Sequence, residues 1–215
     1  MATAGSTLLM IPTPQEREAL LRLEPRLADR YILETVGFGP VSAAIGAMAA
    51  LAHHRPPQVF LVGLAGTFIG DALGSVVCYH SVCMTGIGLP TSQGLASGVA
   101  SGFDAYLRDQ YGPLLCPPGL TTRKQLLTVC IPAANTQDID VRRTNFPDAA
   151  GEDMEGYAVA AACHRHQIPL AIIRAVSNEV GQRDKQQWRF REAFTALAKT
   201  LCVLSEPPLA ETTLE

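Results

Sequence analysis

The chain has 215 residues, a formal net charge of −3 and 47% hydrophobic residues. This length fits a single domain over residues 1–215, and the apolar content is too high for a disordered chain. Seventeen basic residues against twenty acidic ones leave no basic surplus of the kind that nucleic-acid binding requires, and the apolar runs fall well short of the ~20 residues that a membrane-spanning helix needs. We therefore expect neither a nucleic acid nor a membrane as a partner.

The first residues and the cysteines favour a cytoplasmic protein. The first twelve residues have no basic segment, and the apolar run Leu8–Ile11 is too short for a signal peptide. The six cysteines, at positions 78, 83, 116, 130, 163 and 202, form no CxxC pair and lie mostly in apolar runs, as small hydrophobic residues do. We therefore predict free thiols, a cytoplasmic location and no bound metal.

Strand-like and helix-like segments alternate along the chain. Short apolar or β-branched runs predict strands at Leu8–Pro12, Tyr31–Val36, Val59–Val62, Ser75–Thr85, Leu126–Ile131 and Leu170–Val176. Helical spacing and helix-start signals predict helices at Gln15–Ala28, Pro40–His54, Asp153–His166 and Gln186–Leu204. A tight turn is expected at Gly63–Gly66, a long loop at Leu89–Gly102, an irregular segment at Tyr111–Thr122 and a frayed tail over residues 205–215.

This alternation predicts an α/β fold with a mostly parallel sheet. In such sheets, ligands bind beyond the carboxyl ends of the strands. The residues that follow the predicted strands are therefore the first candidates for a site: Glu16, Gly37–Val41, Gly63–Gly66, Thr85–Pro90, Ala133–Asn135 and Arg174–Asn178.

Two motifs suggest a cofactor or a metal only weakly. Gly37-Phe-Gly39 is a fragment of the dinucleotide fingerprint that lacks the third glycine, so we interpret it as a strand-to-helix turn. His164 and His166 are two residues apart in an expected helix, where such positions point to different faces. We therefore expect no cofactor.

An acidic cluster lies where the third helix is expected to begin. Carboxylates favour a helix N-terminus, which explains Glu152 and Asp153 as well as a functional role does. Glu155 differs because it belongs to the segment Met154-Glu-Gly-Tyr-Ala, and the buried strand that follows ends in Arg174-Ala-Val-Ser-Asn178.

These segments resemble the nucleoside phosphorylase/nucleosidase superfamily, whose members split the N-glycosidic bond of purine nucleosides. In that family a Met-Glu pair opens a helix, and a later strand ends in Arg-x-x-Ser followed by Asp or Asn. Pro12-Thr-x-x-Glu16 matches the first acidic residue of the family's site, and the glycine turns at 37–44 and 62–66 match its two glycine turns. The resemblance covers residues 8–204 and implies a central mixed β-sheet flanked by α-helices.

The resemblance implies a role for each matched residue. Glu16 is expected to polarise a water, Arg174 to help place that water and hold Glu16, and Asn178 to contact the purine. Met154, Glu155, Ser177, Ala65 and Gly66 are expected to bind substrate, with Glu155 taking the 2′- and 3′-hydroxyls in charge-assisted hydrogen bonds. Plain structural roles stay open, because Glu16 also suits a helix N-terminus and Arg174 could belong to an ion pair unrelated to catalysis.

Asn178 favours a 6-oxopurine such as hypoxanthine. Adenine-cleaving relatives generally carry Asp there, which can protonate N7, whereas an amide both donates and accepts. The run from Ser177 to Trp188 resembles one nucleosidase subfamily, whose substrate carries hypoxanthine and an aromatic carboxylate on its 5′ side. That 5′ group needs an apolar slot and a cation, for which the candidates are Trp188, Phe194, Phe103 and Arg183, although Trp188 and Phe194 are explained at least as well as core residues.

Water is expected as the nucleophile. Phosphorylases of this superfamily grip phosphate with an Arg and a Ser around the second glycine turn, where this chain has Phe60-Leu-Val-Gly-Leu64-Ala-Gly66. Leu64 also removes a hydroxyl that some nucleosidases use on the water. Two alternatives stay open: a methylthioadenosine/S-adenosylhomocysteine type of nucleosidase, and a non-catalytic nucleoside-binding protein on the same fold. By resemblance, a homodimer or larger homo-oligomer is expected.

Overall fold

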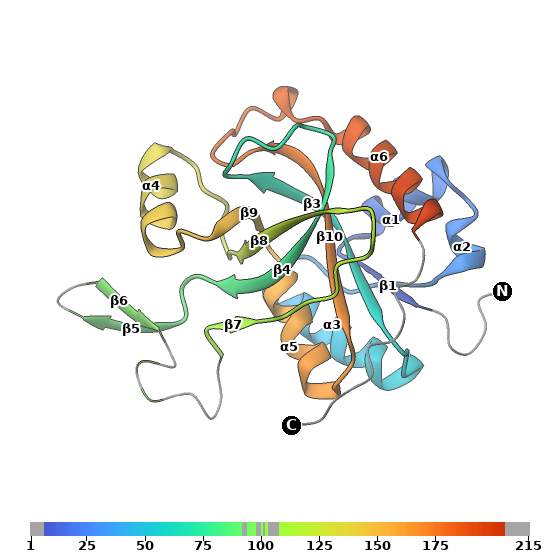
Figure 1. Ribbon diagram of the computed structural model, residues 1–215, viewed down its shortest axis with the longest axis horizontal. Helices are drawn as coiled ribbons and strands as arrows, with labels where there is room; N and C mark the ends of the chain where they lie inside the picture. Colours follow the sequence, from blue (N-terminus) through green and yellow to red (C-terminus); the bar gives the residue numbers. More distant parts are fainter. Residues whose placement is uncertain (1–6, 92–93, 98–99, 101, 103–107, 205–215) are drawn as a thin grey trace.

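The structure is a computed structural model that describes residues 7–91, 94–97, 100, 102 and 108–204. Its centre is an eight-stranded mixed sheet (Figure 1). The strands of this sheet are β1 (Leu8–Ile11), β2 (Ile32–Thr35), β3 (Val59–Thr67), β4 (Val76–Met84), β7 (Gln110–Tyr111), β8 (Thr121–Thr128), β9 (Ala149–Asp153) and β10 (Leu170–Glu179). The helices are α1 (Pro14–Leu23), α2 (Leu27–Arg30), α3 (Gly39–His54), α4 (Thr136–Asn145), α5 (Gly156–His166) and α6 (Phe190–Val203), with a 3₁₀ turn η1 (Lys185–Gln187) before α6.

The sheet curls until two of its strands meet. The strand order is β10-β4-β8-β9-β3-β1-β2, and β10 also pairs with β3, so five strands close into a barrel and β1 and β2 extend from it. β3 pairs with β10 and β1 in parallel and with β9 in antiparallel orientation. The fold is therefore the mixed sheet flanked by helices that the family resemblance implies.

Helices cover the sheet on both faces, which is why β1 and the first four residues of β3 and of β10 are apolar at every position rather than alternating. In β3, Val59 and Leu61 belong to one core cluster, with α3 and α5, whereas Phe60 and Val62 belong to a second cluster, with α1, α2 and α6. Figure 1 shows α3 and α5 together on one side of the sheet and α1 and α6 on the other. This double layer fixes the carboxyl ends of β1, β3 and β10 relative to one another.

The helices next to the site have clear start and stop signals. Thr13 caps α1, and Pro14 occupies its first turn, where a missing N–H is harmless. α3 begins at Gly39 with Pro40 in its first turn and ends at His54, and the following Arg55 adopts a left-handed conformation (φ 46°) before Pro56. The turn between β2 and α3 is thereby held at the sheet edge, close to α5.

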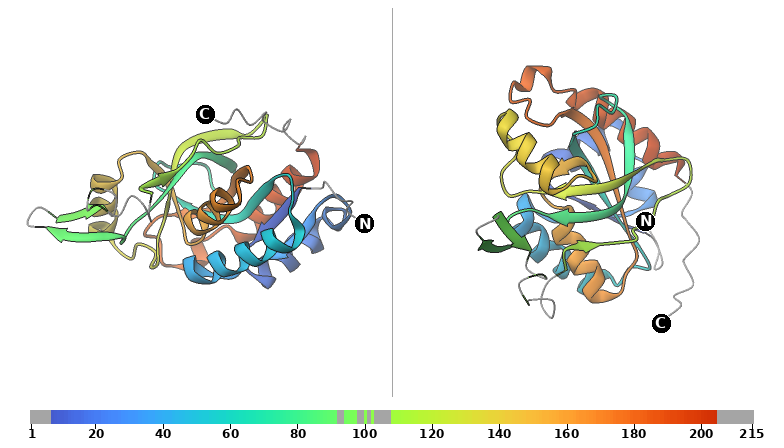
Figure 2. Two further views of the ribbon diagram at one scale, coloured as in Figure 1. Left: turned by 90° about the horizontal axis from the view of Figure 1, so that it is seen from below. Right: turned by 60° about the vertical axis from the view of Figure 1, so that its left-hand side comes forward.

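Several predicted boundaries are wrong. The stretch Gly63–Gly66 is not a turn, because β3 continues through it, and Glu152 and Asp153 do not begin a helix, because they lie in β9 and α5 starts at Gly156. The predicted loop Leu89–Gly102 contains a hairpin of β5 (Gly88–Thr91) and β6 (Gly94–Ser97), which projects from the body (Figure 2).

Other boundaries moved, and some predictions cannot be compared. The strand predicted at Leu126–Ile131 runs earlier, as β8, and the last helix starts at Phe190 rather than Gln186. α4 was not predicted. Phe103 and the tail 205–215 lie outside the described residues. Within the described ranges, the helices are too short or too polar to cross a lipid bilayer.

Candidate active site

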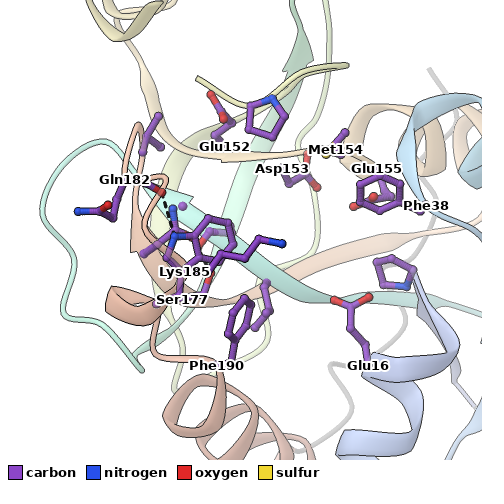
Figure 3. A pocket seen from close by; sticks show the side chains of 18 of the residues that line it. Glu16, Phe38, Glu152, Asp153, Met154, Glu155, Ser177, Gln182, Lys185 and Phe190 are labelled. Carbon is purple, nitrogen blue, oxygen red and sulfur yellow. Dashed lines mark hydrogen bonds between the residues drawn. The ribbon is translucent and has the colours of Figure 1, made fainter. Parts of the chain in front are cut away.

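A cavity of about 500 Å³ opens at the carboxyl ends of β1, β3 and β10. Seven of the eight residues predicted for the site line it: Glu16, Ala65, Gly66, Met154, Glu155, Ser177 and Asn178. The eighth, Arg174, is fully buried behind them. Figure 3 shows Glu16 on one side of the pocket, with its carboxylate turned toward Asp153 and Glu155 on the other. The fold therefore brings together residues more than 150 positions apart in sequence.

Glu16 is held in place by the start of its own helix. Its Oε2 accepts hydrogen bonds from the Thr13 backbone N–H at 3.0 Å and from the Thr13 hydroxyl at 2.7 Å, which completes a capping box. Burial raises the pKa of Glu16, while the Thr13 hydroxyl and the charge of Arg174 oppose that rise. A carboxylate with a raised pKa and a fixed rotamer has the properties of a general base.

Glu155 joins the start of α5 to the start of α3. Its Oε1 accepts a hydrogen bond from the Gly39 N–H at 2.9 Å, and the residue is buried at the N-cap position of α5. Burial and then the neighbouring charge of Asp153 raise the pKa of Glu155 to about 7, although the charge of Arg174 acts in the opposite direction. The carboxylate therefore changes protonation state near neutral pH.

Arg174 forms its direct ion pair with Asp153. The distance from Nη2 to Asp153 Oδ2 is 2.5 Å, both side chains are 0% exposed, and Glu155 Oε2 lies 3.8 Å from the same nitrogen. Asp153 also accepts hydrogen bonds from the Thr128 hydroxyl at 2.6 Å and from the Gly156 N–H at 2.8 Å. The expected contact with Glu16 is indirect: both groups flank Gly63, where an added Cβ would lie 2.7 Å from Arg174 Nη1 and 3.2 Å from Glu16 Oε1.

A bulge in β10 sets the direction of Asn178. The pairing register between β10 and β3 shifts between Val176 and Asn178, which places Asn178 opposite Gly66. The Asn178 amide nitrogen donates to the Glu179 carbonyl at 2.7 Å, and its oxygen accepts from the Ser177 hydroxyl at 2.8 Å. Because an amide nitrogen has two hydrogens, one N–H of Asn178 stays available to a ligand.

Another buried carboxylate, that of Glu152, lies on the far wall. Glu152 in β9 lines the pocket and pairs with Arg142 of α4, and its Oε1 accepts from the Ala133 N–H at 3.1 Å. Burial raises the pKa of Glu152, and Arg142 opposes this. Arg142 also donates to the Ile131 carbonyl at 2.7 Å, so it links α4 to the segment that follows β8.

The mouth of the pocket is formed by the segment after β10. Trp188 and Phe190 contact each other with ring centroids 5.2 Å apart, and the Trp188 indole N–H donates to the Gln182 carbonyl at 2.9 Å. Phe194, Arg183 and Lys185 also line this part. Trp188 and Phe194 are therefore pocket residues as well as packing residues, and two cations lie beside them.

Several polar or aromatic contributors to the pocket were not predicted from the sequence. Asp153 and Glu152 were given no preference over ordinary helix-start residues, and Phe38 and Lys185 were not singled out. The signal for the two acids was available, because both directly precede Met154-Glu155. Phe38, which reaches the pocket from the turn before α3, lies in the candidate range Gly37–Val41, but no motif marked it individually.

Sequence comparisons find one family and several named relatives. A sequence model described as the phosphorylase superfamily matches residues 24–206. A futalosine hydrolase of Streptomyces coelicolor is 32% identical over 181 residues (80% of this chain, 77% of the relative), and one of Thermus thermophilus is 34% identical over 181 residues (79% and 78%). A 5′-methylthioadenosine/S-adenosylhomocysteine nucleosidase of Haemophilus influenzae is 29% identical over 196 residues (83% and 85%).

The fold is shared with solved structures as well. A 5′-methylthioadenosine/S-adenosylhomocysteine nucleosidase from Neisseria meningitidis superposes with a TM-score of 0.72 at 20% identity, over 92% of this chain and 96% of that one. The chain belongs to the phosphorylase superfamily. Its relatives are hydrolases and nucleosidases, so within the superfamily the chain is an N-glycosidic hydrolase.

Proposed function

We propose that the protein hydrolyses the N-glycosidic bond of futalosine, releasing hypoxanthine and dehypoxanthine futalosine, in the alternative route of menaquinone biosynthesis. The observation that carries the proposal is Asn178 in the pocket wall, with one amide hydrogen free, opposite Gly66. The relatives at 32% and 34% identity, both named futalosine hydrolases, agree with it. So does the run from Ser177 to Trp188, which resembles that subfamily's signature.

In the proposed reaction, a water oxygen bonds to C1′ of the ribose as the bond from C1′ to N9 of the purine breaks. Glu16 takes a proton from the water, because its carboxylate is fixed by Thr13 and its Oε1 lies beside Gly63. The leaving purine keeps the electron pair of the broken bond. The Asn178 amide donates to the base, which stabilises the negative charge that develops there.

Glu155 is proposed to bind the 2′- and 3′-hydroxyls, with Met154 against the sugar. In its ionised form Glu155 accepts from both hydroxyls, and its negative charge stabilises the cationic ribose of the transition state. Arg174, held by Asp153, favours the ionised forms of Glu16 and Glu155, because its charge opposes the rise in their pKa values that burial causes. Ser177, Ala65 and Gly66 are proposed to shape the base subsite. No organic cofactor or metal enters this mechanism.

Water rather than phosphate is proposed as the nucleophile. The strand segment 60–66 supplies the pocket wall with Leu64, Ala65 and Gly66, which offer phosphate neither a cation nor a hydroxyl. A phosphate dianion beside Glu16 and Glu155 would meet like charges at close range.

An adenine nucleosidase is the second candidate, because a methylthioadenosine/S-adenosylhomocysteine nucleosidase is 29% identical over 83% of the chain. Product analysis separates the candidates. The protein is incubated with futalosine, inosine, adenosine and methylthioadenosine, with and without phosphate, and free base is quantified. Hypoxanthine from futalosine at equal rates with and without phosphate supports the proposal. Faster release of adenine from methylthioadenosine favours the second candidate, and base release only with phosphate refutes hydrolysis.

A homodimer or larger homo-oligomer is part of the proposal. Val41, Ile45 and Met48 form an apolar stripe along the outer face of α3, and Val41 and Ile45 are 72% and 68% exposed. Phe38, at the start of the same helix, is exposed and also lines the pocket. A second copy packed on this stripe would cover apolar surface and lie next to the pocket.

We also propose that residues 1–215 act as one domain in the cytoplasm. Burial raises the pKa of the thiols of Cys78, Cys83 and Cys163 to about 11, about 12 and about 12. These cysteines therefore stay protonated and pack as small apolar side chains, in keeping with a reducing compartment.

A further inference from the structure

We propose that Glu152 reads the N1–H of a 6-oxopurine and, together with Asn178, makes the site selective against adenine. This inference rests on the proposed function and assigns one base-recognition contact within it. Glu152 lies in β9, which pairs with β3, and β3 pairs with β10 at the end of the pocket. No sequence motif singled Glu152 out.

Asn178, Gly66 and Glu152 are consecutive across the sheet. Asn178 of β10 is paired with Gly66 of β3, and Gly66 is in turn paired with Glu152 of β9. Directly paired residues project from the same face of a sheet, so Asn178 and Glu152 flank Gly66 at two strand spacings, about 10 Å. Gly66 leaves the space between them open, and an added Cβ there would lie 3.2 Å from Asn178 Nδ2 and 3.0 Å from Val180 Cγ2.

The hydrogen bonds of Glu152 determine what this wall offers. The Ala133 N–H, which would suit an acceptor on the ligand, is already used by Glu152 Oε1 at 3.1 Å. Glu152 Oε2 pairs with Arg142. Each carboxylate oxygen has two acceptor positions, so a further acceptor position remains on each. The wall therefore presents an acceptor in place of a backbone donor.

An acceptor at this position discriminates between the two purines. Hypoxanthine has a donor at N1 and an acceptor at C6, whereas adenine has an acceptor at N1 and a donor at C6. An ionised Glu152 accepts from hypoxanthine N1–H and repels the lone pair on adenine N1. The Arg142 guanidinium opposes the effect of burial on Glu152 and so favours the ionised form. Figure 3 shows Glu152 and Glu16 well apart in the pocket, so base recognition and water activation use different walls.

A purely structural role is the competing explanation. α4 has no buried residues, so the pair between Arg142 and Glu152 contributes to holding that helix against β9. Loss of a structural pair lowers stability and affinity for both bases together. Only a base-reading role changes the ratio of the two affinities, so that ratio is the measurement.

The experiment is calorimetric binding of free hypoxanthine and free adenine to the wild type and to Glu152→Gln. A glutamine can turn either its oxygen or its NH₂ toward the ligand, so the hypoxanthine-to-adenine affinity ratio should fall about tenfold or more. If Glu152→Gln does not fold, the double variant with Arg142→Met removes both charges of the pair and should show the same fall. The matched control is Asp71→Asn, which breaks another shielded carboxylate–arginine pair, with Arg123, and should leave the ratio unchanged.

An unchanged ratio in folded Glu152→Gln, or an equal fall in Asp71→Asn, overturns the inference. Free bases carry no 5′ group and are not cleaved, which separates this result from the fate of the proposed function. Failure to cleave futalosine with the ratio still dependent on Glu152 refutes the function and keeps the inference. Cleavage of futalosine together with an affinity ratio that does not depend on Glu152 supports the function and refutes the inference.

Discussion

Replacing Asp153 with asparagine removes one charge from the fully buried centre of the site while preserving the shape of the side chain. Asp153 Oδ2 accepts from Arg174 and from the Gly156 N–H, and Oδ1 accepts from the Thr128 hydroxyl. An asparagine oxygen can serve only one of these two sides. Its NH₂ can face the Thr128 hydroxyl, which can accept as well as donate, but asparagine is neutral, so Arg174 loses its closest counter-charge.

The expected cost is large because neither partner reaches water. Arg174 and Asp153 are both 0% exposed, and breaking such a pair by removing one partner costs about 3–5 kcal/mol of folding free energy. For a chain of this length that corresponds to a fall of roughly 10 °C in the melting temperature. Such a loss is a large fraction of the folding free energy of a typical protein, so the variant should fold but show a clearly measurable fall in stability.

The same substitution should move the pH dependence of catalysis downward. The pKa of Glu155 is raised to about 7 by burial and then by the charge of Asp153, and Arg174 lowers it. Removing Asp153 removes a raising charge and leaves Arg174 free to interact with Glu155. If Glu155 must be ionised to hold the ribose hydroxyls, kcat/KM rises with pH through about 7 in the wild type and at lower pH in Asp153→Asn.

Two measurements test this reasoning. Urea unfolding followed by circular dichroism gives the free energy of unfolding. A profile of kcat/KM from pH 5 to 9 is the second measurement, because kcat/KM reports the pKa values of the free enzyme. The control is Asp148→Asn, because Asp148 forms an exposed pair with Lys124 just before β9 and should cost little. A loss under about 1 kcal/mol in Asp153→Asn would contradict the buried-pair estimate. If the acidic limb of the kcat/KM profile stays in place or moves to higher pH in Asp153→Asn, the proposed effect of the Asp153 charge on the pKa of Glu155 is refuted.

Three further predictions concern the pocket and the α3 stripe. Glu16→Gln and Glu155→Gln should each lower turnover about 10²-fold or more in folded protein, whereas Glu18→Gln, on the exposed side of α1, should not; full activity in either variant would remove that assignment. Asn178→Asp should shift kcat/KM from 6-oxopurine toward 6-aminopurine nucleosides, and an unchanged ratio would mean that Asn178 does not read the base. Val41→Glu combined with Ile45→Glu should shift sedimentation toward the monomer, and an unaltered assembly would place the interface elsewhere.

The sequence predicted the parts of the fold whose local and tertiary preferences agree. The start of β3 at Val59 and the helix ending at His54 have strong apolar patterns and clear boundary signals, and both were predicted, although β3 continues five residues beyond the predicted end at Val62. β9 was missed because Ala149–Asp153 has no β-branched residue and ends in two acids. Its extended form comes from pairing with β8 and β3, which are far away in sequence.

The site shows the same division. Motif matching found Glu16, Glu155 and Asn178 because each belongs to a short recognisable segment, but it could not show that Arg174 pairs with Asp153 across 21 residues. Gly63 was read as part of a turn, whereas it is a strand residue whose missing side chain leaves room for Arg174 and Glu16. α4 lacks an apolar face, and only its Asn135 cap, which accepts from the Asp138 N–H, could have revealed it.

The buried centre of the site contains more acidic than basic groups. One guanidinium, Arg174, is influenced by three carboxylates, Asp153, Glu155 and Glu16, so full ionisation leaves an excess of negative charge in the unliganded enzyme. A proton on Glu155 corrects part of this excess near neutral pH, and a positively charged sugar mimic would correct it instead. Such a ligand should therefore bind more tightly as pH rises through neutrality and should expel a proton on binding. The number of protons released can be measured by calorimetry in buffers of different ionisation enthalpy. Binding of a cation that resembles the transition state is therefore expected to be coupled to proton release.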